Sequence, residues 1–148
     1  MKFIADVHNS ISQCPATLAL VSNKVYQSFA SSSVAMPYLI VGALSDEALS
    51  ATLNGNTDTL RKASIPIMCV SSTVSNAAII ADQLRVELYN ARGILATGTT
   101  VLNVHILETS YQWDPGEDGS ENGAHICVVN INFFYRSTTP APVTFTEL

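Results

Sequence analysis

The residues of this chain best suited to hold a metal are two histidines and a cysteine in its last third. His125 and Cys127 are two residues apart, so in a strand they share one face, and His105 falls in the strand expected before them. Imidazole and thiolate are ligands that zinc prefers. Three ligands make a thin set, however, and no acidic fourth stands beside them. The two histidines are equally consistent with ordinary strand residues, and the cysteine with a buried thiol. We therefore predict no metal and no cofactor.

The three cysteines favour burial over catalysis. They lie far apart with no CxxC spacing, which fits neither a disulfide framework nor a zinc ribbon. A nucleophilic cysteine needs a histidine and an electropositive, partly exposed setting. Cys69 lies in an apolar strand, Cys14 precedes a proline, and the sequence has no GxSxG, phosphate-loop or HExxH motif. We therefore expect buried free thiols and a protein that is not an enzyme.

Two charged groups are candidates for contact with partners. An acidic loop between Gln112 and Gly123 lacks the carboxylate alternation of an EF-hand, and is either a solvated loop tip or a loop that a partner orders. Its acidic residues are Asp114, Glu117, Asp118 and Glu121. The basic pair Arg61 and Lys62 is either a solvated strand end or a contact to an acidic neighbour.

Composition bounds the class of protein. The 148 residues fit one domain, which we place at 1–148, with 47% apolar and only 13% charged residues. So little charge leaves apolar surface for other chains to cover. A net charge of −5, from 7 basic and 12 acidic residues, argues against a protein that grips nucleic acid. We expect neither a signal peptide nor a membrane span, because polar residues interrupt each apolar run.

Periodicity predicts an α+β fold, a mainly antiparallel sheet with helices on one face. In chain order, we expect a helix over 3–13, a short turn over 16–21, strands over 38–41 and 62–71, a helix over 73–92 and a long hairpin after Gly98. Thr73 suits the N-cap of the long helix and Gly93 its C-terminal glycine. Pro37 opens its strand, whereas Pro66 indicates a sheet edge or a bulge.

The apolar positions give the expected core. In the long helix they are Ala77, Ile80, Ala81, Leu84 and Leu88; in the hairpin they are Leu102, Val104 and Ile106 against Cys127, Val129, Ile131, Phe133 and Tyr135. The tail over 138–148 carries Pro140 and Pro142, which exclude a central strand, so we expect it to run extended over the surface or onto a neighbour. Self-association is expected through this tail and through strand edges.

In the order of its motifs, the chain resembles the bacteriophage tail-completion, or tail-terminator, proteins. The similarity runs over about residues 3–136. Its segments are Lys24-Val25-Tyr26, Met36-Pro37-Tyr38-Leu39-Ile40, Ile65-Pro66-Ile67-Met68-Cys69, the helix Asn76 to Tyr89, the Gly93 turn, Tyr111-Gln112-Trp113-Asp114-Pro115, and Val128 to Arg136. The chain departs from the family pattern in the acidic segment over 117–122 and in the tail.

The resemblance implies a structural virion protein at the junction of head and tail, assembled in the host cytoplasm. It implies a homo-oligomeric ring of six subunits that caps the tail tube, meets the head connector and lets DNA pass without tight binding. Two alternatives stay open. One is another ring subunit of the neck or tail tube, and the other is a small cytoplasmic hydrolase or binding domain.

Overall fold

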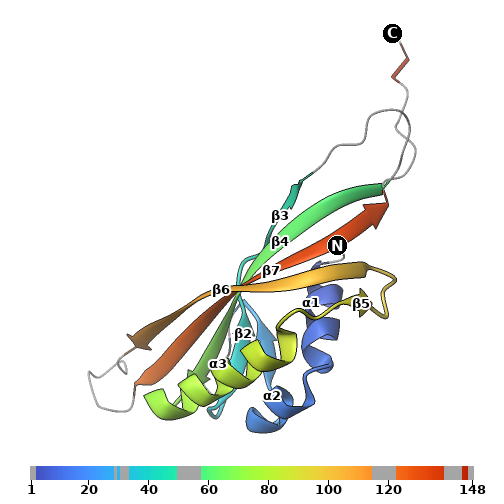
Figure 1. The fold of residues 1–148 in the computed structure, drawn as a ribbon. Helices are drawn as coiled ribbons and strands as arrows, with labels where there is room; N and C mark the ends of the chain where they lie inside the picture. The colour runs from blue at the N-terminus through green and yellow to red at the C-terminus, as the bar shows by residue number, and fades with distance from the viewer. Residues whose placement is uncertain are drawn as a thin grey trace.

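Three helices lie on one face of a curled sheet in the computed structural model (Figure 1), which describes residues 3–28, 30, 34–49, 58–114, 123–138 and 145–146. The helices are α1 (Phe3–Ser12), α2 (Pro15–Leu20) and α3 (Val74–Leu88). The strands are β1 (Val25–Gln27), β2 (Tyr38–Val41), β3 (Ser45–Ala48), β4 (Asp58–Ser71), β5 (Gly93–Ile94), β6 (Thr100–Asp114) and β7 (Ala124–Thr138). The predicted α+β class, with a mainly antiparallel sheet, is confirmed.

The seven strands of the described residues pair in the order β1-β2-β4-β7-β6-β5, and β3 also pairs with β4. Only β1 and β2 run parallel. The centre is the pairing of β4 with β7, which continues from Asp58 opposite Thr138 to Ser71 opposite His125. β6 pairs with β7 over nearly as long a stretch, so the three long strands β4, β7 and β6 form the main part of the sheet.

The core lies between α3 and the concave run of β4 and β7 (Figure 1). Every position of α3 expected in the core is buried, and so is every expected position of β7. The buried residues of β4 on this face are Ala63, Ile65, Ile67 and Cys69. Val70 points to the other face and is only 2% exposed, so the sheet is covered on both sides there.

Pro66 lies inside β4, opposite the break between β2 and β3. These two short strands pair with successive stretches of one side of β4, at 67–70 and at 61–64. A proline has no amide hydrogen for a neighbouring strand, so it is tolerated where the ladder is interrupted. Neither predicted setting is found: β4 is a central strand, and its register with β7 continues through Pro66 opposite Asn130 without a bulge.

Two expected features differ from the structure. The oxygen of the Thr73 side chain accepts from the amide of Asn76 at 3.2 Å, as predicted for an N-cap, but α3 ends at Leu88 and not near Arg92. Asn90, with φ 55°, takes the left-handed conformation that we assigned to Gly93. Asparagine tolerates this region because its short amide group stabilises the turn locally. Gly93 begins β5 instead.

Candidate functional site

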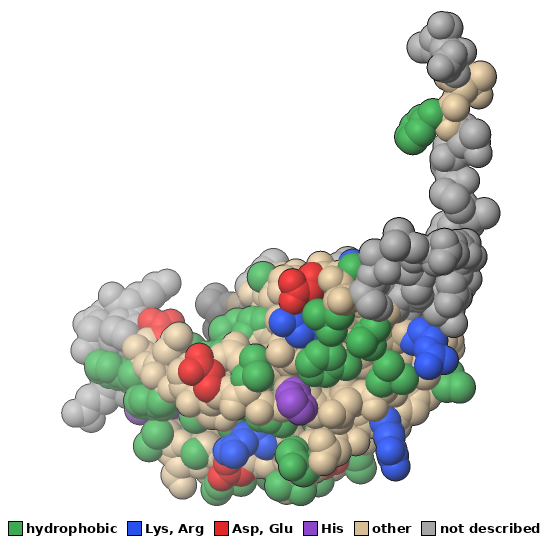
Figure 2. Space-filling view, turned by 45° about the horizontal axis from the view of Figure 1, so that its top comes forward, with side chains coloured by type: hydrophobic (Ala, Val, Ile, Leu, Met, Phe, Trp, Pro, Cys, Tyr) green, Lys and Arg blue, Asp and Glu red, His purple; other side chains and the backbone are tan. Residues whose placement is uncertain are grey.

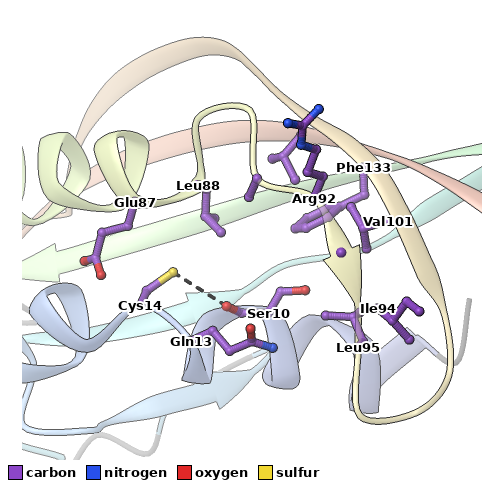
Figure 3. A pocket seen from close by; sticks show the side chains of 13 residues that line it. Ser10, Gln13, Cys14, Glu87, Leu88, Arg92, Ile94, Leu95, Val101 and Phe133 are labelled. Atoms are coloured by element: carbon purple, nitrogen blue, oxygen red, sulfur yellow. Dashed lines mark hydrogen bonds between the residues drawn. The ribbon is translucent and has the colours of Figure 1, made fainter.

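A cavity of about 150 Å³ lies between α1, the end of α3 and β5 (Figure 3). Leu88, Leu95, Val101 and Phe133 give it an apolar wall. Sites for cofactors or drug-sized ligands are larger, typically 300–1,000 Å³. The cavity is too small for such a ligand, so any catalytic role would depend on the reactivity of the polar groups that border it.

Cys14 is the one thiol that borders this cavity, and its environment keeps it protonated. Its side chain is 1% exposed, and its Sγ donates to the backbone carbonyl of Ser10 at 3.5 Å (Figure 3). Burial, and next the negative charge of Glu87, raise the pKa of Cys14 to about 12. A catalytic cysteine needs the opposite shift, because the thiolate is the nucleophile. This arrangement gives no support to an active site.

Glu87 also borders the cavity, and its carboxylate caps the N-terminus of α2. One carboxylate oxygen accepts from both the amide and the hydroxyl of Thr17 at 2.6 Å, and the other accepts from the amide of Ala16 at 3.3 Å. These amides are free donors in the first turn of α2, so Glu87 acts as a cap supplied by α3. Burial raises the pKa of Glu87, but the hydrogen bonds from Thr17, Ala16 and Gln83 outweigh it and leave the pKa below its usual value.

The two histidines considered as metal ligands lie on opposite faces of the sheet. His125 shares its face with Cys127, but His105 lies opposite Asn132 and packs edge-on against Phe134, with ring centroids 5.6 Å apart. His125 instead stacks against the rings of Tyr111 and Trp113. No group of three or more potential metal ligands occurs within the part of the chain that the structure describes.

Cys69 and Cys127 are direct partners across β4 and β7. All three cysteines are free and buried, which confirms the prediction of buried thiols. Burial is the main cause that raises the pKa of each of these two, followed by the neighbouring thiol for Cys69 and by Asp82 for Cys127. Both thiols therefore stay protonated and serve as small apolar core residues.

The described charged residues that were predicted to contact partners, Arg61, Lys62 and Asp114, are not gathered in one place. Arg61 Nε lies 3.2 Å from Asp46 Oδ1, and Lys62 Nζ lies 2.8 Å from Glu47 Oε1, so β3 neutralises both cations. Asp114 is the exposed last residue of β6, at the other end of the long strands. The predicted residues outside the described part of the chain are Glu117, Asp118, Glu121, Pro140 and Pro142.

A long open edge is the most prominent feature of β6. β7 pairs with β6 over most of its length, whereas β5 pairs only with Thr100 and Val101. Beyond these, the outer edge of β6 has no strand partner among the described residues, and it bonds to the rest of the chain through the Val104 carbonyl, which accepts from the Asn90 amide. Unpaired amides and carbonyls in a row are a template for another strand.

Bulges turn apolar side chains outward along this edge. The register with β7 shifts after Val101 and again after Ile106, and the residues at these shifts include Leu102 and Leu107. Their exposed fractions are 38% and 56%. The strict alternation predicted for Leu102 was therefore wrong, because a bulge places an extra residue in one strand and reverses the pattern. Val101 is buried in its place.

The outer side of α3 continues this apolar surface. A groove of about 460 Å³ runs between α3 and β6, lined by Asp82, Arg85, Val86, Tyr89, Ile106 and Leu107. Val86, Tyr89 and Leu107 of this lining are exposed hydrophobic residues, and α3 and β6 carry three more outside it. We call the six together the β6 flank: Ile79, Val86, Tyr89, Leu107, Tyr111 and Trp113, each at least 50% exposed. Elsewhere charges are scattered, and Figure 2 shows Lys and Arg side chains dispersed singly over one face. So long an apolar strip indicates a surface for another chain.

Sequence reasoning missed the β6 flank, although a signal for it exists. Ile79, Val86 and Tyr89 are spaced by seven and three residues, which gives a second apolar stripe along the long helix. The charged residues Asp82 and Arg85 obscure this signal, because charged side chains on one side of a helix are typical of a solvent-exposed face.

Comparison with known proteins adds a likeness of fold. No protein-family model and no curated protein matches the sequence. Among solved structures, a chain of one titled "Virion of native gene transfer agent (GTA) particle" is similar, with a TM-score of 0.60 and 16% identity, covering 90% of this chain and 99% of that chain. The likeness therefore extends over nearly all of both chains.

No helix among the described residues is long and apolar enough to cross a membrane.

Proposed function

We propose that this protein is a non-enzymatic structural subunit of a phage-like particle, of the tail-completion type that closes the tail tube and joins it to the head. The observation that carries the proposal is the β6 flank on an open strand edge, which suits a subunit built to assemble. The likeness to a chain of a virion particle supports it. The protonated Cys14 and the fully engaged Glu87 of the enclosed cavity fit a role without catalysis.

The sheet supports assembly into a ring. Its two sides are unlike: the long edge of β6 bounds one, and the short strands β1 and β3 bound the other. A contact between unlike surfaces is heterologous, and such contacts form a closed ring when the rotation between subunits closes. We propose six copies, with the tube protein on one face of the ring and the head connector on the other.

The charge of the chain supports a conduit for DNA more than a binder. The net charge is −5, and β3 already pairs with the adjacent cations Arg61 and Lys62. Phosphate contacts from free Lys and Arg add affinity through counterion release, whereas carboxylates repel the backbone within a Debye length of about 8 Å. We propose that Asp114, Glu117, Asp118 and Glu121 project toward the lumen or its rim.

Purification of the full chain, followed by native mass measurement and negative-stain microscopy, tests the ring. We expect ring particles of six times the 15.8 kDa chain mass, and antibody labelling at the head-proximal end of tails. A monomer at all concentrations, also with tail tubes present, contradicts the proposal. Label along the whole tube would favour a tube subunit instead.

A gel-shift titration with duplex DNA at low salt tests the conduit. We expect no tight complex, and an Asp114→Lys variant should bind more strongly than the unaltered protein because it adds a cation and removes an anion. Tight binding by the unaltered chain would favour a nucleic-acid-binding role.

A further inference from the structure

Phe145 is the most exposed large hydrophobic side chain of the described residues, at 92%. It lies in the sequence Val143-Thr144-Phe145-Thr146-Glu147-Leu148, where the apolar residues Val143 and Phe145 alternate with threonines as in a strand. A side chain of this size finds no place on its own domain. Its exposure indicates that another surface covers it.

The β6 flank offers the matching surface. The open edge of β6 runs on to Asp114, whereas β1 has three residues and β3 has four. A strand edge of this length supplies backbone donors and acceptors for an added strand, and the groove beside it supplies an apolar pocket for alternate side chains. Val86, Tyr89 and Leu107 line that groove and leave more than half of their side chains exposed.

Distance along the sheet decides which copy supplies the strand. Ile106, next to Leu107 in the groove, pairs with Ile131, which is seven residues before Thr138 and therefore about 23 Å away along β7. Seven residues also separate Thr138 from Phe145, and they span at most about 25 Å when fully extended. The tail of the same chain would need all of this length and a reversal of direction. Residues that precede Pro140 and Pro142 favour extended backbone, which opposes such a reversal.

We propose that residues 143–148 of one copy bind as an added strand to the open edge of β6 in a second copy, with Phe145 in the groove beside α3. The inference rests on the proposed self-assembly and specifies its contact. It gives the two prolines a role in an extended arm, and it supplies a strand partner for the outer edge of β6, which has none beyond Val101 among the described residues of one subunit.

Disulfide trapping between two full-length variants tests the contact. A Leu107→Cys chain is mixed with a Phe145→Cys chain, and a mild oxidant is added; the native cysteines are all buried, so the introduced thiols dominate. We expect a dimer linked between copies. The matched control replaces Leu107→Cys with Leu20→Cys, because Leu20 is 41% exposed on α2, away from the groove, and should give on the order of tenfold less product.

The fluorescence of Trp113 gives a second readout, because it is the only tryptophan and lies on the β6 flank at 51% exposure. Its emission should shift to shorter wavelength on assembly, and Phe145→Ala should require on the order of tenfold more protein for the same shift, whereas Phe145→Leu should restore most of it. Equal linkage to Leu20→Cys overturns the contact. If oligomers form but Leu107→Cys gives no disulfide with Phe145→Cys, the proposed contact is wrong and the proposed ring remains. If the protein stays monomeric and no disulfide forms, both proposals are wrong.

Discussion

The backbone amide of Gly42 donates a hydrogen bond of 2.8 Å to the carbonyl oxygen of Pro66, across the gap between β2 and β3. This close approach is possible because glycine has no Cβ. A Cβ added to Gly42 would lie 2.7 Å from Pro66 Cγ and 3.1 Å from the Pro66 carbonyl oxygen. The proline that interrupts the ladder and the glycine that bridges the interruption are therefore a matched pair.

Gly42→Ala should lower the free energy of unfolding by about 1–3 kcal/mol, because the new methyl group overlaps the proline ring. Urea denaturation measures the change. Adding Pro66→Ala to Gly42→Ala should recover part of the loss, so the double-mutant cycle should give a coupling of at least about 0.5 kcal/mol. Strict additivity of the two changes would contradict the contact.

Leu84→Ala should lower the free energy of unfolding by about 2–5 kcal/mol, because Leu84 is fully buried between α3 and the sheet and its truncation leaves a cavity. Val86→Ala is the matched control on the same helix, since Val86 is 72% exposed. It should change stability by less than about 0.5 kcal/mol in the monomer. Similar losses at both positions would show that the face of the helix is misassigned.

Glu87 should make the protein sensitive to acid. Its folded-state pKa is lowered, so the unfolded state binds more protons, and the stability it contributes is complete above its unfolded-state pKa of about 4.3. This contribution is lost as the pH falls through the lower folded-state pKa. Urea midpoints measured from about pH 6 down to about pH 3 should fall more steeply for the unaltered protein than for Glu87→Gln. Parallel curves would exclude the role of Glu87 as a cap for α2.

The three thiols should resist modification until the protein unfolds. Each is at most 5% exposed and has a raised pKa, so a thiol reagent at neutral pH meets almost no accessible thiolate. We expect negligible release of chromophore from the native protein and about three equivalents in denaturant. One rapidly reacting equivalent in the native state would point to Cys14, beside the cavity.

Periodicity was sufficient to predict the parts of the fold that bury one continuous apolar face. The stripe of α3 and the alternation of β7 each repeat over several turns or residue pairs, so every core position expected on these two elements is buried. Thr73 was predictable for a local reason, because capping depends on a side chain and an amide three residues apart.

Short and irregular elements could not be predicted in the same way. β1 and β3 contain three and four residues, and β3 carries Asp46 and Glu47, so no apolar pattern marks them. Their strand structure depends on partners far along the chain, such as Arg61 and Lys62 for β3. The bulges of β6 could not be predicted for a related reason, because the register depends on both paired strands and not on the sequence of β6 alone.

The candidate site was predictable only as a class of surface. The low share of charged residues indicated contact with other chains, and open strand edges and an extended tail are general means of such contact. Which strand has the open edge could not be predicted, because it depends on which strands pair. Arg61 and Lys62 have acidic partners within their own chain, and their contact with another subunit stays a prediction. The acidic loop beyond Asp114 and the prolines of the tail also stay predictions.

The unbroken pairing of β4 with β7 has a mechanical consequence. Fourteen residues of each strand are in register, and the strands run antiparallel along the long dimension of the sheet (Figure 1). A force that pulls the two strands in opposite directions along their axes loads all of these hydrogen bonds together, instead of opening them one after another from an end. The sheet should therefore resist a pull along its strands more strongly than a pull that peels away its short outer strands β1, β3 and β5.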